Sequence, residues 1–251
     1  MKHFLLLFGF VIIPCIISSF IEQTGFLDEQ LKNIRVKNAV EEKKDLLAQT
    51  LQKSGFSQTN INILIVAYKA ESVLEVYVKE KTAQNYTQLL SYPICASSGI
   101  LGPKRREGDL QVPEGFYHIN HFNPVSNFHL SLGINYPNAA DKLKSSFPKL
   151  GGSIYIHGSC VTIGCLPLTD DYIKELYVLS VYAKNNGQGK IPVYIFPFKM
   201  NEENMNLYLI KYSRNIVLTE FWKNLKTGYD SFTSTKRQLT FSTDTKGNYT
   251  Y

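Results

Sequence analysis

Apolar and polar residues divide the chain into three stretches of different character. Residues 4–21 carry no charge, are rich in Leu, Ile, Val and Phe, and follow Lys2 and His3. A short basic start before an apolar run is typical of a secretory signal or an uncleaved N-terminal anchor. The run is at the lower edge of bilayer-spanning length and contains Pro14, which favours export over a permanent span. We therefore predict that residues 1–21 direct the protein to the periplasm or cell envelope.

The second stretch, residues 29–53, has the pattern of an amphipathic helix. Apolar residues recur among Lys, Glu and Gln at Leu31, Ile34, Val36, Val40, Leu47 and Leu51. Gly55 follows, as a glycine often does where a helix ends. We predict a helical spacer over residues 22–57, which either lifts the following domain off the membrane or packs against it.

From residue 61 onward, the pattern changes to short β-branched and aromatic runs. Residues 61–68 and 73–78 are two such runs joined by a short turn, which predicts a β-hairpin. Further strands are expected at residues 86–95, 116–119, 128–134, 153–156 and 193–196, and helices at residues 170–181 and 202–212. The pattern predicts a mainly β fold, a mixed β-sandwich or barrel-like domain with a few peripheral helices and the N-terminal helix.

This domain is expected to span residues 58–230. The tail over residues 231–251 is rich in Ser, Thr and Lys and has little periodicity. Terminal segments of this kind are poorly ordered unless other contacts hold them. We therefore predict a flexible C-terminal tail.

Charged residues are spread along the chain. The net charge is +6, from 27 Lys and Arg against 21 Asp and Glu, and no dense basic block stands out. A nucleic-acid-binding surface would need basic residues clustered on one element, so the composition argues against a nucleic-acid partner. A mildly positive balance suits the polyanionic surface of a cell envelope instead.

The cysteines point to a functional thiol. Removal of the N-terminal segment, which contains Cys15, leaves Cys95, Cys160 and Cys165. An odd number in an exported domain leaves at least one thiol unpaired. Because an idle thiol is a liability in an oxidising compartment, one of the three is expected to have a function. Cys15 is interpreted as part of the apolar run, since the residues before it lack the small side chains of a lipoprotein processing site.

Residues 154–170 carry the densest indication of chemistry. A predicted strand ends at His157, Gly158 permits a tight turn, and a short loop returns through Gly164 to Cys165 just before a predicted helix. A histidine can remove the proton of a thiol or lower its pKa. Backbone N–H groups at a Gly-Cys corner can also stabilise a developing oxyanion.

Simpler interpretations of the same residues are open at this point. His157 at a strand end also fits a structural histidine. Cys160 and Cys165 fit a disulfide, although so short a loop would gain little stability. A zinc site would need further paired ligands, which the chain lacks, so neither a metal nor another cofactor is predicted. On the residues alone, a thiol enzyme leads these alternatives.

Three stretches place this segment in a wider pattern. They are residues 92–117, which contain the run LGPKRREGD, residues 131–141 with the sequence SLGINYPNAAD, and residues 157–170. In this order they resemble the YkuD-type L,D-transpeptidase domain family, and within it the YafK-like subgroup. The resemblance extends from about residue 61 to residue 229, so it covers most of the chain after the N-terminal segment.

The resemblance implies a fold, a reaction and the residues that perform it. The fold is the L,D-transpeptidase catalytic fold. His157 is similar to the general base of the family, Cys165 to its acylated nucleophile, and the amides of Gly164 and Cys165 to its oxyanion hole. The substrates would be peptidoglycan stem peptides. The thiolate would attack the carbonyl of the third stem residue, a D-residue would leave, and an amine or water would take the acyl group.

The chain departs from the family pattern in two places. Thr162 and Ile163 stand where most members have Ser and His before the Gly-Cys corner, and Pro167 stands where they tend to have Arg or Asn. Without a second histidine, His157 is the only nearby candidate for the base. The absent Arg removes an obvious contact for a substrate carboxylate, so substrate recognition is expected to differ.

Several residues are candidates for that recognition. Arg105 and Arg106, together with Lys104, carry donors that suit carboxylates, and the alternative is a solvated loop. Tyr136 either lines the cleft with its hydroxyl or packs in the core. Ser159, in the loop before Cys165, completes the predicted substrate-binding set.

The other two cysteines receive structural interpretations. Cys95 precedes a predicted strand end and is predicted to be a buried apolar residue. Cys160 lies in the active-site loop. It is predicted to be a neutral packing residue, with reversible pairing to Cys165 as the alternative.

Three functions are compatible with this sequence. The first is an L,D-transpeptidase that remodels the cell wall by forming cross-links or attaching proteins to it. The second is a hydrolase of the same family that releases such attachments, since water and an amine attack the same thioester. The third is a non-catalytic wall-binding module, against which the presence of both His157 and Cys165 argues. The predicted partners are stem peptides and a wall-attached protein, with the chain as a monomer that touches the membrane only through its N-terminal segment.

Overall fold

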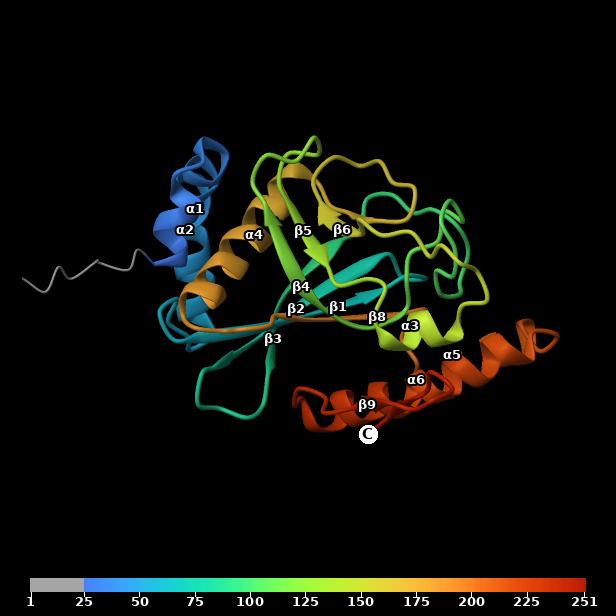
Figure 1. Cartoon of the computed structure of the whole chain (residues 1–251). Helices are drawn as coiled ribbons and strands as arrows, with labels where there is room; N and C mark the ends of the chain where they lie inside the picture. Colours follow the sequence, from blue (N-terminus) through green and yellow to red (C-terminus); the bar gives the residue numbers. More distant parts are fainter. Residues whose placement is uncertain (1–24) are drawn as a thin grey trace, which may run out of the picture.

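The computed structural model describes residues 25–251 (Figure 1). The predicted signal or anchor over residues 1–21, with Cys15, lies outside the described residues. Within the described part, no helix is both long and apolar enough to cross a membrane. These residues form a curled sheet that carries helices on both of its faces (Figure 1).

An eight-stranded mixed sheet is the centre of the fold. Its strands lie in the order β3-β2-β1-β8-β4-β5-β6-β7. In chain order they are β1 (Ile61–Tyr68), β2 (Val73–Glu80), β3 (Thr87–Pro93), β4 (Gly115–Asn123), β5 (Ser131–Ile134), β6 (Tyr155–His157), β7 (Leu166–Pro167) and β8 (Pro192–Phe196). The pairs β1–β8 and β6–β7 are parallel, and the other neighbours are antiparallel. The mixed sheet confirms the predicted fold class, and β1–β2 is the predicted hairpin.

Two neighbouring inner strands, β1 and β8, are buried on both faces. In β1, Ile63 and Ile65 belong to the core on one face, whereas Leu64 and Val66 belong to the core on the other. Side chains alternate between the faces of a strand, so a strand covered on both sides is apolar throughout. This explains why the run over β1 is continuous rather than alternating, and β8 repeats the arrangement.

Helices α1 (Phe26–Leu31), α2 (Ile34–Lys53) and α4 (Asp170–Asn185) cover one face of the sheet. The apolar side of α2 is buried against α4. Lys43 of α2 adds an ion pair, with its Nζ 2.6 Å from Asp171 Oδ1 at the start of α4. Of the two arrangements considered for the N-terminal helical segment, the contacts correspond to a helix packed on the domain.

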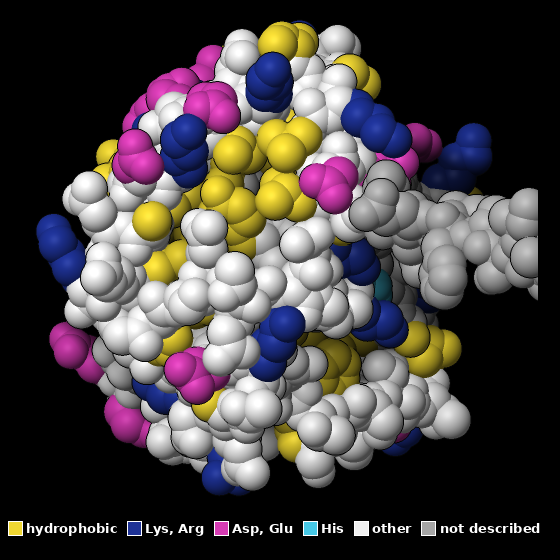
Figure 2. All heavy atoms as spheres, turned by 90° about the vertical axis from the view of Figure 1, so that its left-hand side faces the viewer, with side chains coloured by type: hydrophobic (Ala, Val, Ile, Leu, Met, Phe, Trp, Pro, Cys, Tyr) yellow, Lys and Arg dark blue, Asp and Glu magenta, His cyan; other side chains and the backbone are white. Residues whose placement is uncertain are grey.

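The face that α1 and α2 present carries charges of both signs. Figure 2 shows Lys, Arg, Asp and Glu side chains dispersed around a group of apolar side chains. A basic patch large enough to follow a nucleic-acid backbone would look different, because it gathers one sign of charge on one element. The dispersion on this face agrees with the spread of charged residues along the sequence.

Helices α5 (Glu202–Lys211) and α6 (Ile216–Thr235) cover the opposite face. The sequence pattern predicts α5 but not α6. Helix α6 begins with β-branched residues and ends in a Ser/Thr-rich turn, both of which form helices weakly. Its apolar residues nevertheless recur at helical spacing, and the buried ones are Leu218, Phe221, Trp222, Leu225 and Phe232. Packing of this stripe on the sheet outweighs the low propensity.

A glycine brings α6 close to β4. A Cβ at Gly228 would lie 2.7 Å from Phe116 Cζ and 2.6 Å from the Tyr251 hydroxyl oxygen. Separations this short do not occur for real Cβ atoms, so a larger residue would push the helix away from the sheet. The glycine that lowers the helix propensity of this segment is thus what allows its packing.

The tail predicted to be flexible packs against the same face. Strands β9 (Ser242–Thr243) and β10 (Tyr249–Thr250) form a short hairpin. Tyr249 is 2% exposed, and its hydroxyl accepts a hydrogen bond of 2.9 Å from Asn138 Nδ2. Its ring lies edge-on to Phe116 of β4, with the centroids 4.7 Å apart. A few aromatic anchors therefore hold a segment whose composition is otherwise that of a loop.

A buried ion pair connects the loop between β3 and β4 to helix α6. Glu114 has no solvent exposure, and its Oε1 lies 2.8 Å from Lys69 Nζ. The same oxygen accepts the N–H of Gly102 at 2.7 Å, and Oε2 accepts the indole N–H of Trp222 at 2.9 Å. Lys69 Nζ also donates to the carbonyl oxygens of Gly102 and Val112, at 2.7 and 2.9 Å. One pair of charges thus joins the middle of this loop to its C-terminal end.

Removal of one partner of this pair tests its weight in the fold. Lys69→Met is expected to lower the free energy of unfolding by about 3–5 kcal/mol, because it leaves the Glu114 carboxylate buried without a cation. The double variant Lys69→Met/Glu114→Gln removes both charges and is expected to recover much of that loss. Urea unfolding followed by tryptophan fluorescence gives both values.

The exposed Lys81 supplies the matched control. Lys81→Met is expected to change the free energy of unfolding by less than about 0.5 kcal/mol, as exposed substitutions usually do. If Lys69→Met had the same free energy of unfolding as Lys81→Met, the ion pair would make no measurable contribution to stability. If the double variant were less stable than Lys69→Met, the uncompensated carboxylate would not be the cause.

Candidate active site

His157 and Cys165 lie at the ends of two neighbouring strands. Strand β6 ends at His157, and β7 begins directly after Cys165. The two strands are parallel, and Ile156 pairs with Leu166 as His157 pairs with Pro167. The loop between the strands therefore returns the chain alongside itself, as the sequence pattern predicts.

Both side chains lie on one face of these strands. Ile156 and Leu166 belong to the apolar core. Because side chains alternate along a strand, His157 and Cys165 face the other way. His157 directly follows Ile156 and Cys165 directly precedes Leu166, so the register of the Ile156–Leu166 pair places the two residues on adjacent strands.

His157 is held as a neutral imidazole. It is 2% exposed, and the ring of Phe128 covers it at a centroid distance of 4.7 Å. Its Nδ1 lies 2.6 Å from the carbonyl oxygen of Gly158. Because a carbonyl only accepts, Nδ1 carries the proton and Nε2 keeps its lone pair. Burial lowers the pKa of His157 from its usual 6.5, although the bond to Gly158 opposes the shift.

Cys165 is a protonated thiol in its resting state. It is half-buried and makes no disulfide. Burial raises the pKa of the thiol above its usual 9.0, and a backbone hydrogen bond from Tyr155 and the charge of Lys104 offset only part of the increase. Sγ donates toward the carbonyl oxygen of Ser153 at 3.7 Å. A thiol in this environment needs a base before it can act as a nucleophile.

Thr162 organises the corner before Cys165. Its Oγ1 accepts the backbone N–H of Cys165 at 2.8 Å and that of Gly164 at 3.2 Å, and it donates to the Cys165 carbonyl oxygen at 3.0 Å. Gly164 has a φ of 135°, and a Cβ there would lie 3.0 Å from the carbonyl oxygen of Gln111. A glycine is therefore required at this corner. The two amides predicted to form an oxyanion hole converge here on a single side-chain oxygen.

Two cavities meet at Cys165. A cavity of about 220 Å³ lies between the sulfur and residues 94–101. A second cavity, of about 250 Å³, lies between the sulfur, residues 104–110 and residues 151–154. Cys165 lines both of them, and they share no other residue. The two cavities are therefore placed beside the same cysteine.

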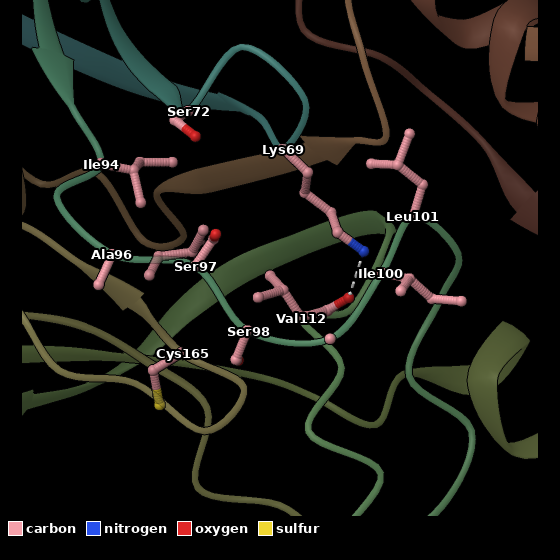
Figure 3. Close-up of a pocket in the computed structure, with 12 residues that line it drawn as sticks. Lys69, Ser72, Ile94, Ala96, Ser97, Ser98, Ile100, Leu101, Val112 and Cys165 are labelled. Carbon is pink, nitrogen blue, oxygen red and sulfur yellow. Dashed lines mark hydrogen bonds between the residues drawn. The ribbon is translucent and has the colours of Figure 1, made fainter.

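The first of these cavities has mostly small and apolar walls. Figure 3 shows Cys165 on one side of it, and Ile100 and Leu101 on the opposite side. Lys69 extends between them with its ammonium group turned toward the carbonyl oxygen of Val112. Because Glu114 neutralises this ammonium group, the cavity does not offer a free cation at this point.

Comparison with known proteins agrees with this geometry. Residues 62–195 match the family described as "YkuD: L,D-transpeptidase catalytic domain". The chain is also 39% identical over 182 residues to "Putative L,D-transpeptidase YafK" of Escherichia coli (strain K12), covering 72% of this chain and 70% of the relative. The chain belongs to the YkuD family. Both the family and the YafK-like subgroup predicted from the sequence are confirmed.

Solved structures similar to this YkuD domain are more distant. Pgp2 of Campylobacter jejuni, a helical cell shape determining protein, is 20% identical with a TM-score of 0.43, over 73% of each chain. Bd1075 of Bdellovibrio bacteriovorus is 23% identical with a TM-score of 0.39, over 70% of this chain and 64% of that one. No residue role follows from similarity at this level.

The YkuD domain separates the basic residues that were predicted to bind substrate. Lys104 lines the second cavity, but its Nζ is bound to Asp109 at 2.6 Å. Arg105 pairs with the buried Asp141, with its Nη1 3.0 Å from Oδ1. Arg106 is exposed. Neither arginine lines a cavity that contains Cys165, so the structure does not bring them to the sulfur.

Tyr136 and Ser159 hold segments of the backbone. The Tyr136 hydroxyl lies 3.3 Å from the carbonyl oxygens of both Lys104 and Leu150. It therefore ties together two segments that border the second cavity. Ser159 has a φ of 65°, and its N–H donates to Asp170 Oδ1 at 2.8 Å. Neither side chain lines a cavity beside Cys165, and their contact with substrate stays a prediction.

The predictions for Cys95 and Cys160 are wrong. Their sulfurs form a disulfide, with the Cα atoms 5.3 Å apart and the residues separated by 65 positions in sequence. The Cys95 N–H donates to the carbonyl oxygen of Pro167 at 3.0 Å, which brings the end of β3 beside the active-site loop. The disulfide thus joins one wall of the first cavity to the loop that ends in Cys165. A pairing between positions so distant in sequence gives no signal in cysteine spacing.

Two residues of the site were not indicated by the sequence pattern. Lys69 lies in the turn after β1, where an isolated lysine is usually solvated, and only the fold brings it to the loop before β4. Thr162 stands where most family members have Ser, so the shared hydroxyl was the available signal. Within residues 25–251, no group of three or more His, Cys, Asp and Glu side chains is placed to hold a metal ion.

Thiol titration tests the disulfide. In the protein lacking residues 1–24, denatured without a reductant, one thiol is expected to react, and three are expected after reduction. Cys165→Ala is expected to lower each count by one, because it removes the free thiol. Three reactive thiols before reduction would contradict the Cys95–Cys160 pairing, and a count of two in unreduced Cys165→Ala protein would show that Cys165 is normally paired with one of the other two cysteines.

Proposed function

We propose that this protein is an L,D-transpeptidase that remodels cell-wall peptidoglycan through an acyl-enzyme on Cys165. Membership of the YkuD family supports the class of reaction. The observation that carries the proposal is that one sulfur lines two separate cavities and shares a strand face with a neutral histidine. An acyl transferase must bring a donor and then an acceptor to one nucleophile, and this arrangement suits that requirement.

In the first half-reaction, Nε2 of His157 takes the proton of the Cys165 thiol as the sulfur attacks the carbonyl carbon of a stem-peptide bond. A C–S bond forms, and the carbonyl electron pair moves to oxygen. When the tetrahedral species collapses, the C–N bond breaks and the departing amine takes the proton from the imidazolium. The products are a thioester on Cys165 and a free D-residue.

In the second half-reaction, an amine in the other cavity attacks the thioester while His157 removes its proton. The C–S bond breaks, the proton passes to the sulfur, and a new amide is formed. If water attacks instead, the same steps give hydrolysis. A hydrolase that releases peptide or protein attachments is therefore the second candidate, and it uses the same residues.

The oxyanion of both steps is proposed to bind the amides of Gly164 and Cys165. Both amides already converge on the Thr162 hydroxyl oxygen, which supports their ability to bind one substrate oxygen. Rotation of the Thr162 side chain would release them. Preorganised amides of this kind lower the barrier because they need no reorientation during the reaction.

The remaining parts of the proposal concern compartment and partners. Residues 1–21 are proposed to export the protein to the periplasm or cell envelope, where stem peptides and wall-attached proteins are its partners. Arg106, Tyr136 and Ser159 are proposed to influence substrate binding through the loops that they belong to. The proton transfers use His157 and Cys165 alone, so the proposal includes no cofactor.

Incubation with purified muropeptides separates the candidate functions. The wild-type protein is expected to form new cross-linked dimers, with release of one D-residue per transfer, as measured by mass spectrometry. Loss of a linked peptide without new dimers would identify a hydrolase, and unchanged muropeptides would favour a wall-binding module. His157→Gln is expected to reduce turnover by about 10²–10⁴-fold, the usual contribution of a general base.

Two variants complete this experiment. Cys165→Ala is expected to form no product, and His121→Gln, at an exposed position of β4, is expected to keep wild-type turnover. A Cys165→Ala protein as active as wild type would overturn the mechanism. An equal loss of turnover in His157→Gln and His121→Gln would contradict a specific role of His157 as the base.

The protonation states predict a pH dependence that needs no substrate. Because the pKa of Cys165 is raised above 9.0, less than about 1% of it is thiolate at pH 7. Alkylation by iodoacetamide, measured in protein lacking residues 1–24, is therefore expected to be slow at pH 7 and to accelerate as the pH rises past 9. A rate that is already maximal at neutral pH would mean a preformed thiolate–imidazolium pair and would contradict the neutral pair.

A further inference from the structure

A third cavity lies next to the first cavity at Cys165, on the side of helix α6. Its volume of about 500 Å³ is about twice that of either cavity at Cys165. It is enclosed by the segment 100–105, the end of α3 (Ala139–Lys144), the first turns of α6 and the turn of the β9–β10 hairpin. Its apolar walls are Ile100, Leu101, Pro103, Val217, Leu218 and Phe221.

The charged residues that line this cavity are all basic. They are Arg105, Lys144 and Lys246, and among residues 25–251 no Asp or Glu lines it. Asp141 pairs with Arg105 from behind, so the guanidinium charge is partly compensated. Lys144 Nζ has a neutral partner, Asn248 Oδ1, at 2.7 Å. Neither lysine makes a salt bridge within the described residues.

Asp244 is the nearest acidic residue to these lysines in the hairpin. Its Oδ1 accepts the backbone N–H groups of Lys246 and Asn248, both at 2.8 Å, and its Oδ2 accepts Asn248 Nδ2 at 3.0 Å. These bonds hold the turn, so the carboxylate is directed at the backbone rather than into the cavity. Burial and the charge of Arg105 lower the pKa of Lys144, and Asp244 opposes the shift only in part.

An aromatic floor holds two of the cations in place. The guanidinium carbon of Arg105 lies 5.1 Å from the ring centroid of Phe221, and Lys144 Nζ lies 5.9 Å from it. Cations at such distances are attracted to the face of an aromatic ring. The cavity therefore combines fixed positive charge with an apolar surface, a combination that suits an anionic group on an aliphatic chain.

This cavity adjoins the first of the two cavities at Cys165. Ile100 and Leu101 line both, and Figure 3 shows these two residues on the side of the first cavity that is opposite Cys165. A peptide whose carbonyl carbon lies at the sulfur and which extends past Ile100 reaches the basic cavity with its next groups. The cavity is thus placed to read a part of the substrate that does not react.

We propose that the cavity of Arg105, Lys144 and Lys246 binds a carboxylate of the peptide that is acylated onto Cys165. This inference rests on the proposed function and names the group that the enzyme recognises. Pro167, at the position where related domains tend to have Arg or Asn, offers no such contact. The basic cavity supplies it from other elements, and Lys144 and Lys246 are the residues that determine specificity.

Calorimetric titration of Cys165→Ala protein with a stem tetrapeptide tests the inference. The comparison is between the peptide with free carboxylates and the same peptide with its carboxylates amidated. In the Cys165→Ala background, Lys144→Gln/Lys246→Gln is expected to weaken binding of the free peptide about tenfold, the value of one lost charge-assisted hydrogen bond. Amidation of the peptide is expected to weaken its binding to Cys165→Ala protein that keeps both lysines by a similar factor. It is expected to have little effect on the already weakened binding to the variant in which both lysines are replaced.

Lys142→Gln is the matched control. Lys142 lies on α3 like Lys144, is exposed and does not line the cavity, so the substitution removes the same charge without removing a contact. Binding of the peptide to this variant is expected to stay within twofold. An equal loss of peptide affinity in Lys142→Gln would mean that net charge, rather than contact in the cavity, explains the effect. That result would overturn the inference.

Two further outcomes would also overturn it. One is equal affinity for the free and the amidated peptide. The other is binding of inorganic phosphate or of phosphatidylglycerol vesicles that depends on Lys144 and Lys246, without binding of the peptide carboxylate. Because the titration uses inactive protein, its result does not depend on turnover, whereas failure of the proposed function is read from the muropeptide products of the wild-type protein.

Discussion

The fold depends on one carboxylate that has no contact with solvent. Glu114 is stable as an anion only because Lys69, the Gly102 amide and the Trp222 indole approach it from three separate parts of the chain. An unpaired charge at this depth costs several kcal/mol, so β1, the loop before β4 and helix α6 cannot separate independently. The consequence reaches the candidate active site, because the same lysine joins the middle of this loop at Gly102 to its last part at Val112, and the loop borders both cavities at Cys165. Stability of the core and shape of the site are therefore set by the same contacts.

Within that frame, the reactive residues are kept in their less reactive forms. Burial favours the uncharged state of each, so His157 rests as imidazole and Cys165 as thiol. A thiolate is oxidised more readily than a thiol, so the protonated form protects Cys165 until, in the proposed mechanism, His157 removes its proton. The Cys95–Cys160 disulfide contributes to the same end, since it leaves a single free thiol among residues 25–251 and fixes the loop that presents it.

Elements with a strong local pattern could be predicted from the sequence, and elements that depend on distant contacts could not. The β1–β2 hairpin follows from two apolar runs and a turn, and the return of the chain from His157 to Cys165 follows from strand, glycine and loop in succession. Helix α6 could not be predicted, because many of its residues are poor helix formers. Packing of Trp222 and its apolar neighbours on the sheet stabilises the helix instead. The disulfide could not be predicted, because only the fold brings Cys95 close to Cys160. The amides of Gly164 and Cys165 could be identified, but their capture by the Thr162 hydroxyl is a matter of side-chain geometry that no spacing reveals.

The proposed catalytic residues and the proposed carboxylate-binding residues lie in different parts of the chain. Residues 62–195, which match the family, contain His157 and Cys165. The basic cavity draws on both parts, with Arg105 and Lys144 inside that range and Phe221 and Lys246 beyond it. A common catalytic sheet can thus acquire a new preference through the helix and hairpin that pack beside it, without any change at the sulfur. Because Trp222 of that helix also binds Glu114, the added segment cannot drift in position relative to the nucleophile. The buried ion pair thus holds the C-terminal segment at a fixed place beside the cavity for which we propose a role in substrate recognition.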